Sequence, residues 1–473
     1  MLLQRDTWSK AEYEQAAHAA IERLASHVDS SQRGERPAVA QPSIEDNIEA
    51  LELRSLIRGG GLDSRRFSDF LGDYLERTTR LHHPGSLAHQ VASPDIPAAL
   101  ADLIHGAIND TAAIYEMGAA GATIELVVLE WMLEKVGWSP DRSAGVLTHG
   151  GSLANLTALL AARARVAPDA WEQGTPADLA VLAPPSVHYS VRRAVSILGL
   201  GERAVCELEV DELERIRVDR LGDALERVRA DGRRPMALVA ASCATATGLH
   251  DDLNGIADFC ERNGIWLHTD AAHGASALLS PKHRELLDGI DRSDSVIWDA
   301  HKMLRTSSLC AAVLMRSGAD LMGAFHQKAS YLFYDDQDSE GVDFIGRAFE
   351  CTKGAIGMKL FLNLAWRGEH GLGAYVGDCY DKTLRFHELI SARPGFECPY
   401  SPESNILCFR YGRDGSRQVA IREHLIAQGE FHISSAEIGG ERYLRIVPTA
   451  PATDDETIER LLDAIEEADR GLD

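Results

Sequence analysis

The sequence predicts an α/β fold in which a mainly parallel sheet is covered by helices. From about residue 120 to residue 320, short apolar runs alternate with longer segments whose apolar residues recur at helical spacing. The apolar runs are rich in β-branched and aromatic residues, which is typical of strands buried on both faces. In such sheets, ligands bind just beyond the carboxyl ends of the strands. We therefore look for functional residues at these positions.

Length, composition and charge limit the range of functions. The chain has 473 residues, enough for two or three domains with a sizeable core, and its 45% hydrophobic and 25% charged content is ordinary for a globular protein. The net charge of -24 argues against nucleic acid or an anionic membrane as a partner. It does not exclude an acidic substrate, because the local field at the site matters more than the total.

The cysteines and the first residues suggest a cytoplasmic protein. Eight cysteines are scattered along the chain without a C-x-x-C pair, so we expect free thiols and no metal site. The N-terminus has no apolar signal-peptide region, and no apolar run approaches the length of a membrane span.

Residues 1–80 are predicted to be helical and amphipathic. Ser9 and Glu12 form a capping-box pattern, and Ser43 begins a second helix after a polar linker that contains two prolines. The apolar faces of these helices must be buried. The sequence allows them to pack either on the chain's own core or on a partner.

A glycine-rich turn follows the first predicted strand of the large domain. A strand over 145–148 leads into H-G-G-S-L-A-N-L, which begins a helix. Gly151 allows close approach of the backbone, Ser152 adds a hydroxyl group, and the helix offers free N–H groups. Together these features form a cradle for an anion.

Four later strands each end in residues that can take part in chemistry. The strand over 179–182 precedes His188, and the strand over 236–239 precedes Thr245. The run 265–267 delivers Asp270, and the run 295–298 delivers a group of three residues: Asp299, His301 and Lys302. We expect Asp270 and Lys302 to converge on one crevice.

A carboxylate and a lysine placed in this way suit pyridoxal 5′-phosphate. This cofactor requires a lysine for its Schiff base and an acid that keeps its pyridine nitrogen protonated. The lysine must be partly deprotonated to attack a carbonyl group, and burial near other cations lowers its pKa. No G-x-G-x-x-G follows a strand, which disfavours a dinucleotide-binding enzyme.

The motifs H-T-D-A-A-H-G and D-A-H-K resemble those of the pyridoxal-phosphate-dependent group II amino-acid decarboxylases. The resemblance extends from about His83 to the C-terminus. It implies the aspartate-aminotransferase-like fold (fold type I) and a homodimer with active sites at the subunit interface. On this basis we expect an N-terminal helical segment over 1–80 that packs on the partner, a large cofactor-binding domain over 81–375, and a small C-terminal α/β domain over 376–473.

The resemblance also implies roles for single residues. Catalysis is expected from Lys302, His188, Asp270 and Tyr331, with Tyr334 as a less favoured substitute for Tyr331. Contacts with the cofactor are expected from Lys302, Asp270, His188, Gly151, Ser152, Thr245, Ala272, Asp299 and His301. Contacts with the substrate are expected from Arg445, His83 and His89. Two departures from the family pattern, Cys243-Ala244 and Lys353-Gly354, leave the function of those positions open.

The expected reaction is decarboxylation of an L-amino acid to an amine and carbon dioxide. The alternatives of the same fold are an aldehyde synthase, a transaminase and an aldolase-type lyase; a catalytically dead scaffold is a further one. The segment Leu87-Ala88-His89-Gln90 replaces the more aromatic run of the aromatic amino-acid decarboxylases. This replacement favours a small acidic or diamino substrate over an aromatic one.

Overall fold

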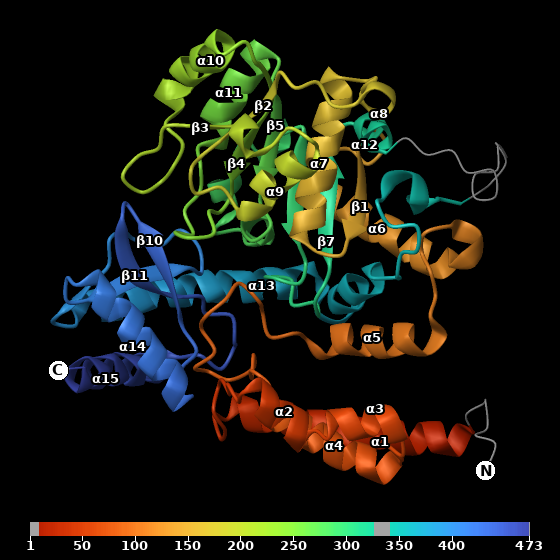
Figure 1. The fold of residues 1–473 in the computed structure, drawn as a ribbon, viewed down its shortest axis with the longest axis vertical. Helices are drawn as coiled ribbons and strands as arrows, with labels where there is room; N and C mark the ends of the chain where they lie inside the picture. The colour runs from red at the N-terminus through yellow and green to blue at the C-terminus, as the bar shows by residue number, and fades with distance from the viewer. Residues whose placement is uncertain (1–8, 326–340, 473) are drawn as a thin grey trace.

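The computed structural model describes residues 9–325 and 341–472, which form a large α/β body, a smaller α/β unit and an N-terminal helical segment (Figure 1). The predicted Tyr331 and Tyr334 lie outside the described residues. The sheet of the large body has seven strands: β1 (Ala144–Thr148), β2 (Leu179–Ala183), β3 (Val205–Glu207), β4 (Arg234–Ala241), β5 (Trp266–Asp270), β6 (Ser295–Asp299) and β7 (Ala311–Met315).

The sheet is mainly parallel, as the sequence predicts. Its strand order is β1-β7-β6-β5-β4-β2-β3. Strand β7 runs antiparallel to both of its neighbours, β1 and β6, and the remaining neighbouring pairs are parallel. The carboxyl ends of β1, β2, β4, β5 and β6 therefore lie along one edge of the sheet.

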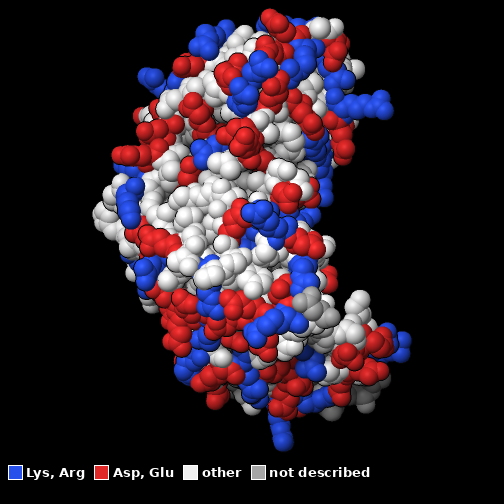
Figure 2. Space-filling model, turned by 90° about the vertical axis from the view of Figure 1, so that its left-hand side faces the viewer, with Lys and Arg blue, Asp and Glu red and all other residues white. Residues whose placement is uncertain are grey.

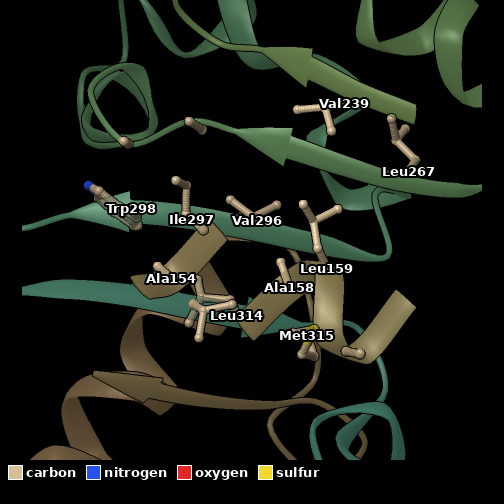
Figure 3. Packing of buried hydrophobic residues seen from close by; sticks show 14 of the residues in the cluster. Ala154, Ala158, Leu159, Val239, Leu267, Val296, Ile297, Trp298, Leu314 and Met315 are labelled. Carbon is tan, nitrogen blue, oxygen red and sulfur yellow. The ribbon is translucent and has the colours of Figure 1, made fainter. Parts of the chain in front are cut away.

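Helices cover this sheet on both faces (Figure 1). They are α6 (Ala119–Val136), α7 (Gly151–Val166), α8 (Ala170–Gln173), α9 (Tyr189–Ile197), α10 (Leu221–Ala230), α11 (Leu253–Asn263) and α12 (Gly318–Ala324). Figure 3 shows Ala154 and Ala158 of α7 packed against the sheet beside Leu314 of β7. Both alanines are wholly buried, and their small side chains allow α7 to lie close to the strands.

The smaller unit contains an antiparallel sheet of four strands in the order β10-β11-β9-β8. Its strands are β8 (Phe396–Glu397), β9 (Leu407–Tyr411), β10 (Ser434–Ile438) and β11 (Glu441–Ile446), and its helices are α14 (Gly415–Gln428) and α15 (Asp455–Gly471). Helix α13 (Gly357–Ala392) joins this unit to the large body and has a kink at Gly368. The helix passes through residue 375, where the sequence suggested a domain boundary.

The N-terminal segment is helical, as predicted, and lies at the bottom of Figure 1, apart from both sheets. It contains α1 (Lys10–Gln32), α2 (Ile44–Ala50), α3 (Leu53–Gly59) and α4 (Ser64–Glu76), followed by α5 (Ile96–Ile108) on the large body. Both predicted N-caps, Ser9 and Ser43, form capping boxes. Over residues 9–325 and 341–472, no helix has the length and apolar character needed to cross a bilayer.

Candidate active site

The crevice lies where β5 and β6 end side by side. Asp270 is the last residue of β5, and Asp299 is the last residue of β6. Ala272 joins the two strand ends, because its N–H group donates to Asp270 Oδ1 at 3.3 Å and its carbonyl oxygen accepts from the Asp299 N–H group at 2.9 Å. The D-A-A turn thus holds the Asp270 carboxylate and the backbone of Asp299 next to each other.

Asp270 is held by a side chain of helix α7. Asn155 of α7 donates from Nδ2 to Asp270 Oδ2 at 3.0 Å. Asn155 is buried, whereas Asp270 is half-buried at the crevice. An oriented, partly accessible carboxylate of this kind can accept a hydrogen bond from a protonated ring nitrogen.

His188 lies against the same crevice. It is the N-cap residue of α9, and together with Thr245 and Asp270 it lines one hollow. Its Nδ1 atom is 2.7 Å from Ser190 Oγ. Burial lowers the pKa of His188, while the charge of Asp270 raises it and that of Lys302 lowers it. The shared hollow places His188 beside Asp270.

Lys302 follows β6 in a tight turn and reaches back to Asp299. Its Nζ atom is 3.6 Å from Asp299 Oδ2, and His301 Nε2 is 3.6 Å from the same oxygen. Asp299 is 3% exposed, and its other oxygen, Oδ1, is buried without a hydrogen-bond partner. Burial raises the pKa of Asp299, and the charges of Lys302 and His301 oppose this effect.

The N-terminus of α7 is the predicted anion cradle. Gly150 is its N-cap with φ of 108°, and no side chain caps the helix. A Cβ atom on Gly151 would lie 2.8 Å from Asp299 Oδ2, so only glycine fits beside this carboxylate. Ser152 is exposed at the same helix end. The free N–H groups and the dipole of α7 favour a phosphate at this point.

Taken together, these residues fit pyridoxal phosphate. The open end of α7 suits the phosphate group, Asp270 suits the pyridine nitrogen, and Lys302 supplies a primary amine that is 18% exposed at the crevice.

Arg445 is buried, but its guanidinium group is largely occupied by the chain itself. It donates to the carbonyl oxygens of Thr245, Ala246 and Ala88 at 2.8, 3.2 and 3.3 Å, and to Ser434 Oγ at 3.2 Å. These contacts use four of its five N–H donors. Arg445 therefore fixes the loop after β4, and its contact with a substrate carboxylate stays a prediction.

The two predicted substrate-binding histidines lie in different surroundings. His83 is buried, accepts from the Gly85 N–H group at 2.9 Å, and lines a hollow formed with residues 34–37 and Arg460. This hollow does not include the residues around Lys302. His89 instead packs edge-on against His432, with the ring centroids 5.3 Å apart, and the charge of Arg445 lowers its pKa in addition to burial.

Three site residues were not predicted to act, although the motifs contain them. Asn155 is the last letter of G-G-S-L-A-N, His268 the first of H-T-D-A-A-H-G, and Ser190 follows His188 by two residues. The structure brings all three into one hydrogen-bonded chain.

In the part of the chain that the structure describes, no group of three or more His, Cys, Asp or Glu side chains has an arrangement suited to a metal ion.

Lys353, one of the departures noted above, is an internal structural residue. Its ammonium group is wholly buried, is paired with Glu125 of α6, and lies 5.7 Å from the centre of the Phe344 ring. Glu125 Oε1 also accepts from the N–H group of Leu147, one residue before the end of β1. This ion pair therefore supports the strand that leads into the α7 cradle.

The chain is similar to known decarboxylases over most of its length. The profile described as "Pyridoxal-dependent decarboxylase conserved domain" matches residues 75–412. Acidic amino acid decarboxylase GADL1 of Bos taurus is 31% identical over 441 residues, which cover 88% of this chain and 84% of the relative. L-2,4-diaminobutyrate decarboxylase of Acinetobacter baumannii is 26% identical over 99% of this chain and 95% of the relative. The crystal structure of mouse CSAD has a TM-score of 0.91 at 26% identity, covering 98% of this chain and 99% of that one.

Proposed function

The chain belongs to the pyridoxal-dependent decarboxylase family, and from this premise we propose that it removes the α-carboxyl group of a small amino acid with a polar side chain. The enzyme class and the cofactor, pyridoxal 5′-phosphate, follow from the family. The observation that carries the proposal for this chain is the placement of Asp270 and Lys302 at neighbouring strand ends, with His188 lining the same hollow as Asp270 and the α7 cradle beside Asp299.

Each residue of the crevice has a proposed task. Lys302 would provide the amine that bonds to the cofactor, and Asp270 would hold the proton on the pyridine nitrogen. The open N-terminus of α7, with Gly151 and Ser152, would hold the phosphate. His188 would lie over the ring and orient the substrate carboxylate.

The bound cofactor supplies an electron sink for the pair of electrons left on Cα when carbon dioxide departs. The chain's own contribution is orientation and proton transfer. Partial burial of His188 and Asp270 limits the access of water to the reacting face. A tyrosine of the 326–340 segment, which we expect to be Tyr331, would return the proton to Cα and so yield an amine rather than an aldehyde.

The proposed substrate class is an acidic or diamino acid. The named relatives act on acidic amino acids and on L-2,4-diaminobutyrate. On this chain, His89 and Arg445 lie near one another, and Arg445 retains one N–H group after its protein contacts. The positive charge of Arg445 favours a side chain that carries a carboxylate over one that carries a second amine.

A substrate panel tests the proposal. Purified protein with added cofactor is incubated with L-aspartate, L-glutamate, L-cysteine sulfinate, L-2,4-diaminobutyrate and L-tryptophan, and the organic product is identified for each. We expect an amine from one of the first four and none from L-tryptophan. An aldehyde would point to an aldehyde synthase, and amino-group transfer would point to a transaminase.

We also propose a homodimer that uses α5. The exposed apolar residues of this helix follow its long axis: Ile96, Leu100, Leu103, Ile104 and Ile108. Their spacing forms a single stripe, and the same helix packs on α13 with its other face. On another face of the molecule, charged residues of both signs are interspersed in the upper and lower parts, and the middle is mainly uncharged (Figure 2).

The dimer proposal predicts that Leu103→Glu lowers the mass of the protein in solution from that of two chains to that of one. Ile197→Glu, an exposed apolar residue on α9, is the matched control and should leave the mass unchanged. Light scattering after size-exclusion chromatography distinguishes these outcomes, and a wild-type monomer would contradict the proposal.

The eight cysteines are all free, which supports a reducing, cytoplasmic location.

A further inference from the structure

We propose that Asn155 and His268 are positioning residues, which hold Asp270 toward the cofactor and determine which nitrogen of His188 carries its proton. They do so through one directional chain of hydrogen bonds that runs beneath the crevice. The inference rests on the proposed function, because it concerns how Asp270 and His188 serve a bound pyridoxal ring.

The first end of the chain is fixed by a donor that cannot accept. Trp266 Nε1, which can only donate, is 2.8 Å from Ser295 Oγ. Ser295 Oγ is 2.8 Å from His268 Nδ1, and its hydroxyl proton is free to be donated to that nitrogen. Burial lowers the pKa of His268 to about 4, and the ring is neutral at pH 7. With Ser295 as the donor to Nδ1, the single proton of the ring lies on Nε2.

The other end is fixed by an acceptor that cannot donate. A carboxylate only accepts hydrogen bonds, so the group of Asn155 that faces the Asp270 side chain must be the amide nitrogen Nδ2. Asn155 Oδ1 then faces His268 Nε2 at 2.7 Å and accepts its proton. Asp270 therefore requires the His268 tautomer with its proton on Nε2, and the contact between Ser295 and Nδ1 is compatible with this tautomer. The hydrogen-bond chain thus has one self-consistent direction.

A branch from Asn155 reaches His188. The second N–H of the Asn155 amide donates to Ser190 Oγ at 2.9 Å, and Ser190 Oγ is 2.7 Å from His188 Nδ1. The backbone N–H group of Ser190 donates to His188 Nδ1 at 3.4 Å, so this nitrogen is an acceptor and the Ser190 hydroxyl group, which accepts from Asn155, donates to it as well. The neutral His188 ring then carries its proton on Nε2, where it can donate to a bound substrate.

The linking residues are buried, so water cannot replace a lost partner. Asn155 and Ser190 are 1% exposed, and His268 and Ser295 are 0% exposed. Asn155 is the branch point, because its three polar contacts join Asp270, His268 and Ser190. Loss of Asn155 should release the carboxylate of Asp270 and leave His268 with an unsatisfied donor.

A test must separate positioning from simple structural support. The apoprotein is titrated with pyridoxal phosphate and, separately, with an analogue whose ring nitrogen is replaced by C–H. Asp270 can form a hydrogen bond only with pyridoxal phosphate, because the analogue has no ring nitrogen. We expect Asn155→Ala to weaken binding of pyridoxal phosphate by about tenfold to a hundredfold, the effect of losing a hydrogen bond to a charged group, and to change binding of the analogue by less than about threefold.

Matched variants complete the test. His268→Leu should behave like Asn155→Ala, whereas His268→Gln should restore selective binding because its amide N–H can still donate to Asn155 Oδ1. Thr157→Ala, which removes a buried hydroxyl group from the same helix, should affect both ligands equally. Thermal unfolding of each apoprotein identifies variants that do not fold. If Asn155→Ala or His268→Leu does not fold, binding by His268→Gln and the pH profile of Ser190→Ala still test the inference.

The outcomes are distinct. Equal weakening of both ligands by Asn155→Ala and His268→Leu would overturn the inference and leave the proposed function standing. A wild-type protein that does not prefer pyridoxal phosphate over the analogue would contradict the proposed role of Asp270 itself. Ser190→Ala should retain the preference for pyridoxal phosphate but shift the pH profile of kcat, because only the branch to His188 is cut. An unchanged profile would overturn that branch.

Discussion

The buried pair of Glu125 and Lys353 allows a quantitative prediction about stability. We consider Lys353→Met, which preserves the aliphatic stem but removes the ammonium group. Both side chains are 0% exposed, so the variant would leave the Glu125 carboxylate without a counter-charge in the core. Removing one partner of a buried ion pair costs about 3–5 kcal/mol of unfolding free energy.

The double variant Glu125→Gln with Lys353→Met isolates the cause. Glutamine retains an oxygen that can accept from the Leu147 N–H group, now 3.0 Å from Glu125 Oε1, and it carries no charge. Its unpartnered amide N–H group still costs about 1–3 kcal/mol. We therefore expect the double variant to be more stable than Lys353→Met alone by about 2 kcal/mol.

The loss of unfolding free energy caused by Lys353→Met should also depend on pH. Burial raises the pKa of Glu125, and without Lys353 nothing of comparable strength opposes this rise. A carboxyl group with a raised folded-state pKa contributes stability below its ordinary pKa of 4.5, and this contribution is lost as the pH rises. The deficit should therefore be small near pH 5 and grow toward pH 8 by up to about 1.4 kcal/mol per pH unit.

The assay is urea unfolding of the apoprotein at fixed protein concentration, followed by tryptophan fluorescence and circular dichroism. A cost below about 1 kcal/mol for Lys353→Met at pH 8, or a double variant less stable than the single one, would refute the reasoning.

Three other predictions follow from the same geometry. Lys302→Ala should abolish product formation and the absorbance change on adding pyridoxal phosphate; residual turnover would contradict its role as the amine. Because the Asp299 carboxylate lies beside Gly151 and burial raises its pKa, Asp299→Asn should bind phosphate more tightly than the wild type at pH 8 and show a weaker pH dependence; equal binding at pH 8 would contradict this. Burial lowers the pKa of His268 to about 4, so neutral His268 makes its full contribution to the unfolding free energy above pH 6.5. About 3 kcal/mol of this contribution should be lost as the pH falls toward 4. In His268→Gln, the unfolding free energy should change less steeply between pH 7 and 5.

The sequence predicts those parts of the site that depend on residues close together in the chain. The apolar runs before Asp270 and Lys302 identify strands, and parallel strands bring their carboxyl ends to one edge, which is enough to place both residues in one crevice. The glycine-rich turn at Gly151 is a similar local signal. The direction of β7 was not predictable in this way, because an apolar run alone does not distinguish a parallel from an antiparallel strand.

The remaining features depend on contacts between distant segments. Asn155 meets Asp270 across 115 positions of sequence, and Arg445 meets Thr245 across 200. No periodicity in the sequence encodes such pairs. The sequence therefore indicates Asn155 only as part of the glycine-rich turn, and it does not indicate that the chain itself occupies the N–H donors of Arg445. His83 illustrates the same limit, since its neighbours come from residues 34–37.

The most direct test of the account is the stoichiometry of carbon dioxide and amine from a C1-labelled substrate. The substrate is the best one in the panel, and wild-type protein is compared with Lys302→Ala. We expect labelled carbon dioxide and the matching amine in equal amounts from the wild type, and neither from the variant. Consumption of the amino acid with the label retained in the organic product would contradict the assigned decarboxylation.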